Sequence, residues 1–267
     1  MFIALCSDKG SPGVTTSALV LASASPEPSF LVEADPHGGD IGIRLRPGGN
    51  ALPEAPTVLS LAAAARSDRD PGLLERYAHR LSETVAVIPA ALRREQMAKV
   101  GDWIRVAEIL ALSERPVFAD LGQIHASSPV AEIAAKADVV VVVARPDMTS
   151  IVRLRDRLAR LGADLAALRG APPRLFPLLL TTTRHGTAHM NDLQVLLNET
   201  PARPFLVGQG FLALDDRCVR KLEAGDDPTG RLARSDLMRS ARTVVGDLVA
   251  ASAPERASNP HVAGAVR

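Results

Sequence analysis

Apolar residues along the chain gather in short blocks and in longer segments with helical spacing. The short blocks are apolar almost throughout, which is typical of strands buried on both faces of a parallel sheet; they cover Phe2–Cys6, Phe30–Glu33, Val85–Ile88, Val117–Asp120, Ala137–Val143, Leu175–Thr181 and Pro204–Val207. The segments that predict helices cover Val14–Ala24, Leu59–Ala65, Leu73–Leu81, Ala91–Leu112 (with a break near Gly101), Ser150–Leu161, Leu193–Leu197 and Ser235–Ala250.

Strands that alternate with helices along a chain form right-handed βαβ units. The pattern therefore predicts an α/β fold, a doubly wound, mostly parallel sheet with helices on both faces. Residues 1–251 are expected to form one domain. From Ser252 onward the chain is small and polar with two prolines, so residues 252–267 are expected to be a disordered C-terminal tail.

The composition gives information about the ligands and the cellular compartment of this domain. The 31 basic and 30 acidic residues give a net charge of +1, so no global field draws the protein to nucleic acid or a membrane. Two cysteines, Cys6 and Cys218, make no disulfide framework and suit a reducing compartment. No segment reaches the roughly 20 apolar residues of a membrane-spanning helix. We expect a soluble, cytoplasmic protein.

The loop after the first predicted strand carries the strongest chemical signal. It reads Lys9-Gly10-Ser11-Pro12-Gly13-Val14-Thr15-Thr16 and opens the first predicted helix. A glycine-rich turn at a helix start directs several backbone N–H groups at one point, where the helix dipole adds positive potential. The threonine hydroxyls of such a turn can ligate Mg²⁺. This loop predicts a phosphate site, with an ordinary turn between strand and helix as the alternative.

Two further loops place carboxylates at the ends of strands. Glu33-Ala34-Asp35-Pro36-His37-Gly38-Gly39-Asp40 follows the second strand, and Ala119-Asp120-Leu121-Gly122 ends a later one. Ordinary turns also use Asp and Gly. Ligands in open α/β sheets, however, bind at the carboxyl ends of the strands, so three such loops in this order favour a binding site.

Together these loops resemble the motifs of the MinD/ParA family of P-loop ATPases, over about residues 1–250. The first is similar to the family's deviant Walker A motif, Lys-Gly-Gly-x-Gly-Lys-Thr-Thr, with Lys9 on its signature lysine. Val14 replaces the second lysine, which contacts the β- and γ-phosphates in the family, and Ser11 replaces a glycine. The second resembles the acidic motif whose aspartate positions the attacking water. The third resembles Walker B.

The resemblance implies a site for ATP and Mg²⁺. It assigns catalysis to Lys9 and Asp35, and metal binding to Thr15, Asp35 and Asp120. The nucleotide would be held by Lys9, Gly10, Ser11, Pro12, Gly13, Val14, Thr15, Thr16 and Gly122. Thr181-Thr182-Thr183 stand where the family has an asparagine that recognises adenine, which leaves the base open. Without the lysine, we expect weak or absent hydrolysis.

Two functions follow from the resemblance. One is a nucleotide-dependent dimerising switch that positions cargo, namely DNA, a division complex, or a pilus or secretion apparatus. The other is a pseudo-ATPase adaptor, for example in pilus assembly, since the altered loop most resembles the TadZ/CpaE-like branch. Both imply a homodimer and a protein partner from a positioning or secretion machinery, with non-specific DNA as a further candidate ligand.

Other features receive structural interpretations. His185 and His189 have a metal-ligand spacing, but Gly186 between them predicts a solvated loop. Trp103 is expected to be a packing residue. The final helix is expected to pack on the sheet rather than contact a membrane. An ordinary exposed helix face, rather than a DNA-binding one, is expected for Arg153, Arg155, Arg157 and Arg160.

Overall fold

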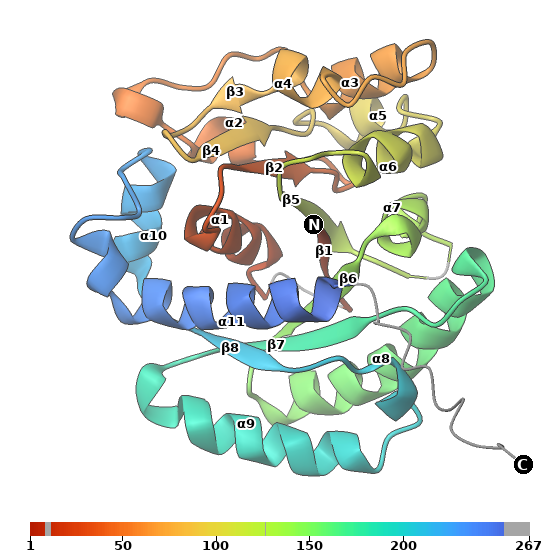
Figure 1. Ribbon diagram of the computed structural model, residues 1–267, viewed down its shortest axis with the longest axis vertical. Coiled ribbons are helices and arrows are strands. Elements are labelled where there is room, and N and C mark those ends of the chain that lie inside the picture. Colours follow the sequence, from red (N-terminus) through yellow and green to blue (C-terminus); the bar gives the residue numbers. More distant parts are fainter. Residues whose placement is uncertain (9–11, 126, 254–267) are drawn as a thin grey trace, which may run out of the picture.

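The computed structural model describes residues 1–8, 12–125 and 127–253, and in this part of the chain eight strands form one sheet (Figure 1). The strands are β1 (Phe2–Ser7), β2 (Ser29–Glu33), β3 (His79–Arg80), β4 (Val85–Ile88), β5 (Val117–Gln123), β6 (Val139–Ala144), β7 (Leu175–Thr181) and β8 (Gly210–Ala213). Their order is β3-β4-β2-β5-β1-β6-β7-β8, and every pair is parallel except β3 with β4. The doubly wound α/β prediction is confirmed.

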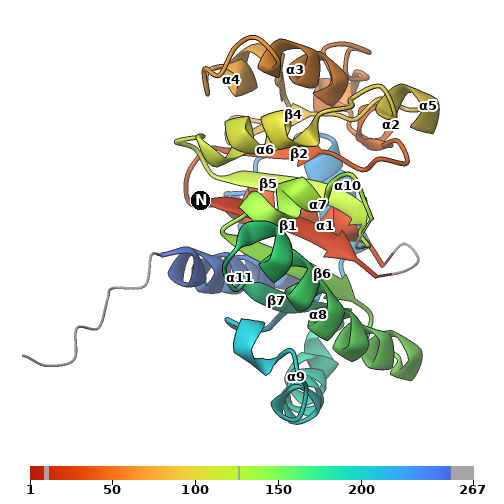
Figure 2. The ribbon, with the colours of Figure 1, turned by 90° about the vertical axis from the view of Figure 1, so that its right-hand side faces the viewer.

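Helices cover both faces of this sheet. One face carries α1 (Val14–Ala24), α10 (Asp216–Glu223) and α11 (Asp236–Ser252). The other carries α3 (Val58–Ala65), α4 (Leu73–Tyr77), α6 (Trp103–Ala111), α7 (Ala131–Lys136), α8 (Met148–Arg169) and α9 (Thr183–Asn198). Figure 2 shows α6, α7 and α8 one below another on that side. Shorter pieces are α2 (Ile41–Arg44), α5 (Arg94–Met97), and the 3-10 turns η1 (Pro47–Gly49), η2 (Arg203–Phe205) and η3 (Leu232–Arg234).

The core lies in two layers, one on each side of the sheet. Alternate residues of β1 supply both: Ala4 packs with the α6 and α7 side, and Leu5 with the α1 and α11 side. All residues of β6 are buried. Because both faces are covered, a strand here gains by being apolar at every position, which explains the uninterrupted apolar runs.

Several expected elements differ in extent. The break near Gly101 is confirmed, since this glycine has φ +69° and separates α5 from α6. The helix expected over Leu73–Leu81 ends at Tyr77, because His79–Arg80 pair antiparallel with β4. Pairing with a distant strand outweighs local helical spacing here.

The last strand was predicted in the wrong place. Pro204–Val207 contains the turn η2 and a single bridge from Leu206 to Leu175, whereas the strand is β8. A Cβ added at Gly210 would lie 2.8 Å from Val244 Cγ2. Glycine lets α11 approach the sheet closely, and it also removes the apolar signal from the strand's first residue.

The prediction of a loop around His185 and His189 is wrong, because both lie in α9. A Cβ at Gly186 would lie 2.5 Å from the Phe211 ring, so the glycine provides room for β8 to pack against the helix. His189 Nδ1 is 2.8 Å from Thr181 Oγ1. Within the described ranges no group of three or more His, Cys, Asp or Glu could hold a metal ion.

The helices can be compared with three further expectations from the sequence. Trp103, 5% exposed, packs in the core as expected. Six apolar residues of α11 are buried on the side that contacts α1 and β8, whereas Val249 is 47% exposed; the expectation that this helix packs on the sheet is confirmed. In the described part of the chain, no helix combines the length and the apolar character needed to cross a membrane.

One arginine of α8 contradicts the expected exposed face. Arg153, Arg155 and Arg160 are exposed, but Arg157 is 7% exposed. Its Nη2 donates to the carbonyl of Ile124, and its Nε lies 3.7 Å from Asp8 Oδ1. The side chain therefore joins α8 to the segments that follow β1 and β5.

Replacing Arg157 by Met tests this link. The variant keeps most of the apolar stem but leaves the Ile124 carbonyl and Asp8 without their cationic partner, so the free energy of unfolding should fall by about 1.5–3 kcal/mol. Urea denaturation measures the change. Arg160→Met, on the exposed side of α8, is the control. Equal unfolding midpoints for the two variants would contradict the structural role of Arg157.

Candidate functional site

The three predicted loops meet at one cleft of about 860 Å³ at the carboxyl ends of the central strands. Its lining includes residues from each motif, among them Gly13, Thr15, Asp35 and Gly122. Lys9, Gly10 and Ser11, also assigned to this site, lie outside the described residues. The convergence follows from the topology, since β1, β2 and β5 are neighbours and parallel.

The start of α1 forms one wall of the cleft. Gly13 has φ +111°, a left-handed conformation that favours glycine. A Cβ there would also lie 2.9 Å from Leu180 Cδ1. Val14 is only 6% exposed and its side chain belongs to the apolar core. At this position the chain therefore offers backbone groups but no cation.

Asp120 is buried, 1% exposed, behind the cleft residues Thr15 and Gly122, on the strand that lies between β1 and β2 in the sheet. Its Oδ1 accepts the Gly122 N–H at 2.9 Å, and the Thr15 side chain hydrogen-bonds the same carboxyl. Residues Leu121 and Gly122, predicted as a loop, are the end of β5, which runs to Gln123. The strand continues because Gln123 still pairs with Ser7, past a register shift.

Gly122 brings the second and third motifs into contact. It has φ +60°, and a Cβ there would lie 1.9 Å from Asp35 Oδ2. Asp35 is thus held directly over the end of β5. Its Oδ1 accepts the backbone N–H of His37 at 2.8 Å and lies 3.1 Å from His37 Nδ1. Any residue other than glycine at 122 would displace this carboxylate.

Burial and neighbouring carboxylates raise the pKa of Asp120. Burial raises its pKa to about 6, the Thr15 and Gly122 hydrogen bonds oppose that rise, and repulsion from Asp35 and Asp40 adds to it. A cation placed near Asp120 would relieve this repulsion.

The donor set fits Mg²⁺ bound together with a phosphate. In the described ranges the protein has no cluster of three or more acidic, His or Cys ligands for a metal. Mg²⁺ is usually held by one or two carboxylates, with phosphate oxygens and water completing its shell. The Ser7 hydroxyl also lines the cleft, is buried, and has no hydrogen-bond partner in the described part of the chain. Such an orphaned group is consistent with a ligand-binding cleft.

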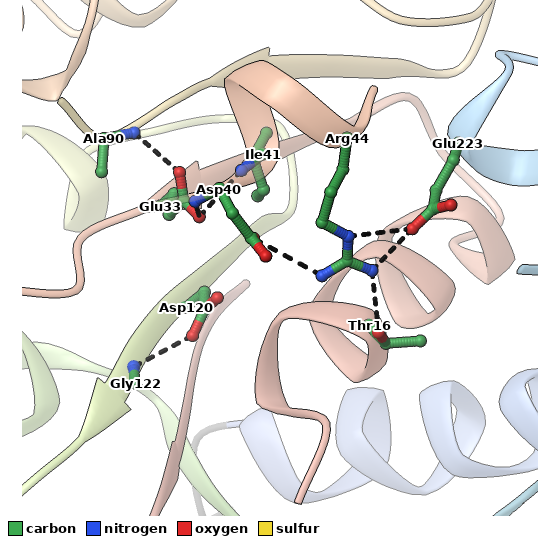
Figure 3. A network of polar contacts seen from close by, with 9 residues as sticks. All are labelled: Thr16, Glu33, Asp40, Ile41, Arg44, Ala90, Asp120, Gly122 and Glu223. Atoms are coloured by element: carbon green, nitrogen blue, oxygen red, sulfur yellow. Dashed lines mark hydrogen bonds and ion pairs between the residues drawn. The ribbon is translucent and has the colours of Figure 1, made fainter. Parts of the chain in front are cut away.

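Glu33 has a structural position in the cleft wall (Figure 3). Its Oε1 accepts the N–H groups of Asp40 at 3.0 Å and Ile41 at 3.2 Å, and its Oε2 accepts that of Ala90 at 3.0 Å. The carboxyl thereby ties the end of β2 to the start of α2 and to the segment after β4. Burial and the Asp120 charge raise its pKa to about 8, while the hydrogen bonds from the Ala90 and Ile41 amides act to lower it. Glu33 shapes the loop that carries Asp35.

Arg44 is a site residue that sequence reasoning missed. Its Nε and Nη2 donate to Glu223 Oε1 at 3.0 and 2.6 Å, and Nη2 also donates to Thr16 Oγ1 at 3.0 Å. Nη1 lies 3.5 Å from Asp40 Oδ1. Figure 3 shows this guanidinium between α2, α1 and α10. No sequence signal marks the arrangement, because Glu223 lies 179 residues further along the chain.

The two buried carboxyls should make stability fall as pH rises. The pKa of Glu33 is raised from 4.5 to about 8, and that of Asp120 from 3.8 to about 6. Between pH 5 and 8 the folded state therefore binds more protons than the unfolded state. The free energy of unfolding should decrease by up to about 1.4 kcal/mol per pH unit for each proton.

Urea denaturation at pH 5.5, 6.5 and 7.5 measures this slope, and Glu33→Gln should flatten it. Stability that is constant or increases over this range would contradict the raised pKa values.

The chain resembles known proteins in its structure but not in its sequence. No family model and no curated protein matches the sequence. Solved structures do match. A ParA family ATPase from Chlorobium tepidum TLS superposes with TM-score 0.68 at 16% identity, over 91% of this chain and 98% of that one.

Two further structures match comparably. An ATP complex of a McdA variant from Cyanothece has TM-score 0.65 at 16% identity, over 93% of this chain and 96% of that one. MinD from Pyrococcus horikoshii OT3, complexed with Mg-ADP, has TM-score 0.65 at 15% identity, over 94% and 98%. The chain thus has the fold of the ParA and MinD ATPases, as its motifs predicted.

Proposed function

We propose that this chain is a MinD/ParA-like protein that binds a nucleotide with Mg²⁺ and acts as a dimerising switch in the positioning of cargo, with weak ATP hydrolysis. The observation that carries the proposal is the convergence of Thr15, Asp35 and Gly122 around one cleft, with Asp120 buried behind it and hydrogen-bonded to Thr15 and Gly122. The fold shared with ParA, McdA and MinD supports it.

Each cleft residue then has a role. The backbone from Gly13 to Thr16 would bind phosphate oxygens at the start of α1. Thr15, Asp35 and Asp120 would hold Mg²⁺, and Asp35 would also orient a water. Bound Mg²⁺ supplies positive charge to the phosphate oxygens. Lys9, outside the described residues, is proposed to contribute a catalytic charge.

Hydrolysis is proposed to be weak because of Val14. Phosphoryl transfer depends on preorganised cations around the transferred group. Val14 is buried and apolar, so the start of α1 supplies no such cation from this position. Loss of one preorganised group in an active site typically costs about 10²-fold in rate.

A smaller cavity of about 150 Å³ is proposed to take the base. It adjoins the start of α1 and is lined by Gly13, Thr16, Leu180 and Leu212, among others. The nearby threonine hydroxyls are already engaged, Thr181 with His189, Thr182 with His185 and Thr183 with Asp236. Contacts to the base would then come from the apolar lining and from Asp215 and Asp216, which also line this cavity.

Exposed apolar residues at the cleft support dimerisation. Ile43 and Leu92 are each 53% exposed and both line the cleft. Apolar side chains at the mouth of a polar cleft are suited to contact with a second protein surface. A second protomer closing over the bound nucleotide would bury them. The cargo is proposed to belong to a partition, division-site, pilus or secretion system, the TadZ/CpaE-like branch included.

A pseudo-ATPase adaptor is the second candidate. The observation that favours it is again the buried Val14, together with Arg44, whose charge is already paired with Glu223 and Asp40. Such an adaptor would keep the fold and the partner surfaces without nucleotide turnover.

Calorimetry with ATP and Mg²⁺ separates the two candidates. The switch predicts micromolar binding, weakened at least tenfold in Asp120→Asn because the metal loses a carboxylate charge. Asp156→Asn, which changes an exposed carboxylate of α8, should bind like the wild type. Absence of binding at millimolar ATP would support the adaptor instead.

Val14→Lys tests the cause of weak hydrolysis. The added ammonium, at the start of α1, should raise the ATP hydrolysis rate by about 10²-fold, measured as released phosphate. Val14→Met, of similar length but uncharged, is the control. If the lysine variant folds and binds ATP but hydrolyses it no faster than the wild type, the missing cation is not what limits turnover.

A further inference from the structure

We propose that Arg145 contacts the phosphate chain of the bound nucleotide and adds positive charge for its binding. The inference rests on the proposed nucleotide-binding function and adds a specific residue to it. The lining of the cleft includes Glu33, Asp35 and Asp40, and the buried Asp120 lies behind the lining residue Thr15, to which it is hydrogen-bonded. A polyphosphate entering this cleft meets several carboxylates and needs cations besides Mg²⁺.

Two arginines of the described chain line the cleft, Arg44 and Arg145. The charge of Arg44 is already used, because its guanidinium pairs with Glu223 and Asp40 and donates to Thr16. Moving it to a ligand would leave Glu223 without this partner. Arg145 differs, since it is exposed and makes no hydrogen bond or ion pair with the described residues.

The position of Arg145 is set by the sheet. It directly follows β6, the strand next to β1, and it lines the same cavities as Gly13 and Thr16 at the start of α1. Pro146 follows and favours extended backbone at Arg145. The side chain lines both the main cleft and the smaller cavity, and these two cavities also share Gly13 and Thr16. Arg145 therefore stands where a chain of phosphates would pass from one cavity to the other.

The chemistry of the side chain fits this role. A guanidinium offers a planar fork of N–H donors that can engage two phosphate oxygens at once. The start of a helix carries partial positive charge, so an arginine beside it is electrostatically unfavourable unless an anion binds between them. In this arrangement the phosphate lies between the N–H groups at the start of α1 and the guanidinium.

The test is calorimetry with Mg²⁺ and three probes: ATP, inorganic triphosphate and AMP. Arg145→Ala should weaken binding of ATP and of triphosphate about ten- to a hundredfold, and of AMP much less. Arg145→Lys should retain part of the affinity. Arg160→Ala, which removes an exposed arginine of α8 away from the cleft, should bind like the wild type. Unchanged melting temperatures show that the variants are folded.

Three outcomes would overturn the proposal. If Arg145→Ala binds ATP as tightly as Arg160→Ala, Arg145 does not contact the phosphates, although the protein still binds nucleotide. Equal weakening for AMP and ATP would move the contact to the nucleoside. If the wild type binds neither ATP nor triphosphate at millimolar concentration, the proposed function fails, and this inference fails with it.

Discussion

The parallel register of β1, β2 and β5 is the constraint on which the cleft depends. In this register Asp120 pairs with Leu5 on one side and with Glu33 on the other, so the carboxyl ends of the three strands lie side by side at one edge of the sheet. Helices cover both faces of these strands. A shift by one residue would turn every side chain to the opposite face. Burial on two sides therefore holds the three loops against one another.

Two buried carboxyls at the ends of β2 and β5 do different work. Glu33 accepts three backbone N–H groups and so shapes the segment that carries Asp35 and Arg44. Asp120 accepts one N–H and the Thr15 hydroxyl, so fewer fixed donors occupy its carboxyl. Both carboxyls are buried, but Glu33 has more fixed hydrogen-bond donors than Asp120. Glu33 therefore has a structural role, whereas Asp120 is a candidate metal ligand.

The positive charges around the cleft come from positions other than Val14, where the deviant Walker A motif has a lysine. Val14 packs into the core there. Arg44 uses its charge to hold α2 against α1 and α10, and Arg157 joins α8 to the segments behind β1 and β5. Both are built into the frame of the site. Arg145, at the carboxyl end of β6, is exposed and free of pairing within the described ranges. Arg44 and Arg157 therefore have structural roles, whereas the proposed phosphate contact is made by Arg145.

The sequence by itself determined the α/β class, the central strands and the loops of the cleft, because these depend on local runs and on short glycine and aspartate motifs. It failed where contacts between distant residues decide. β8 begins with a glycine that lets α11 approach the sheet, Gly186 lies within a helix because Phe211 packs there, and Arg44 finds Glu223 far along the chain. Only the tertiary structure decided which polar residues share the cleft, since burial and distant partners leave no periodic signal in a single sequence.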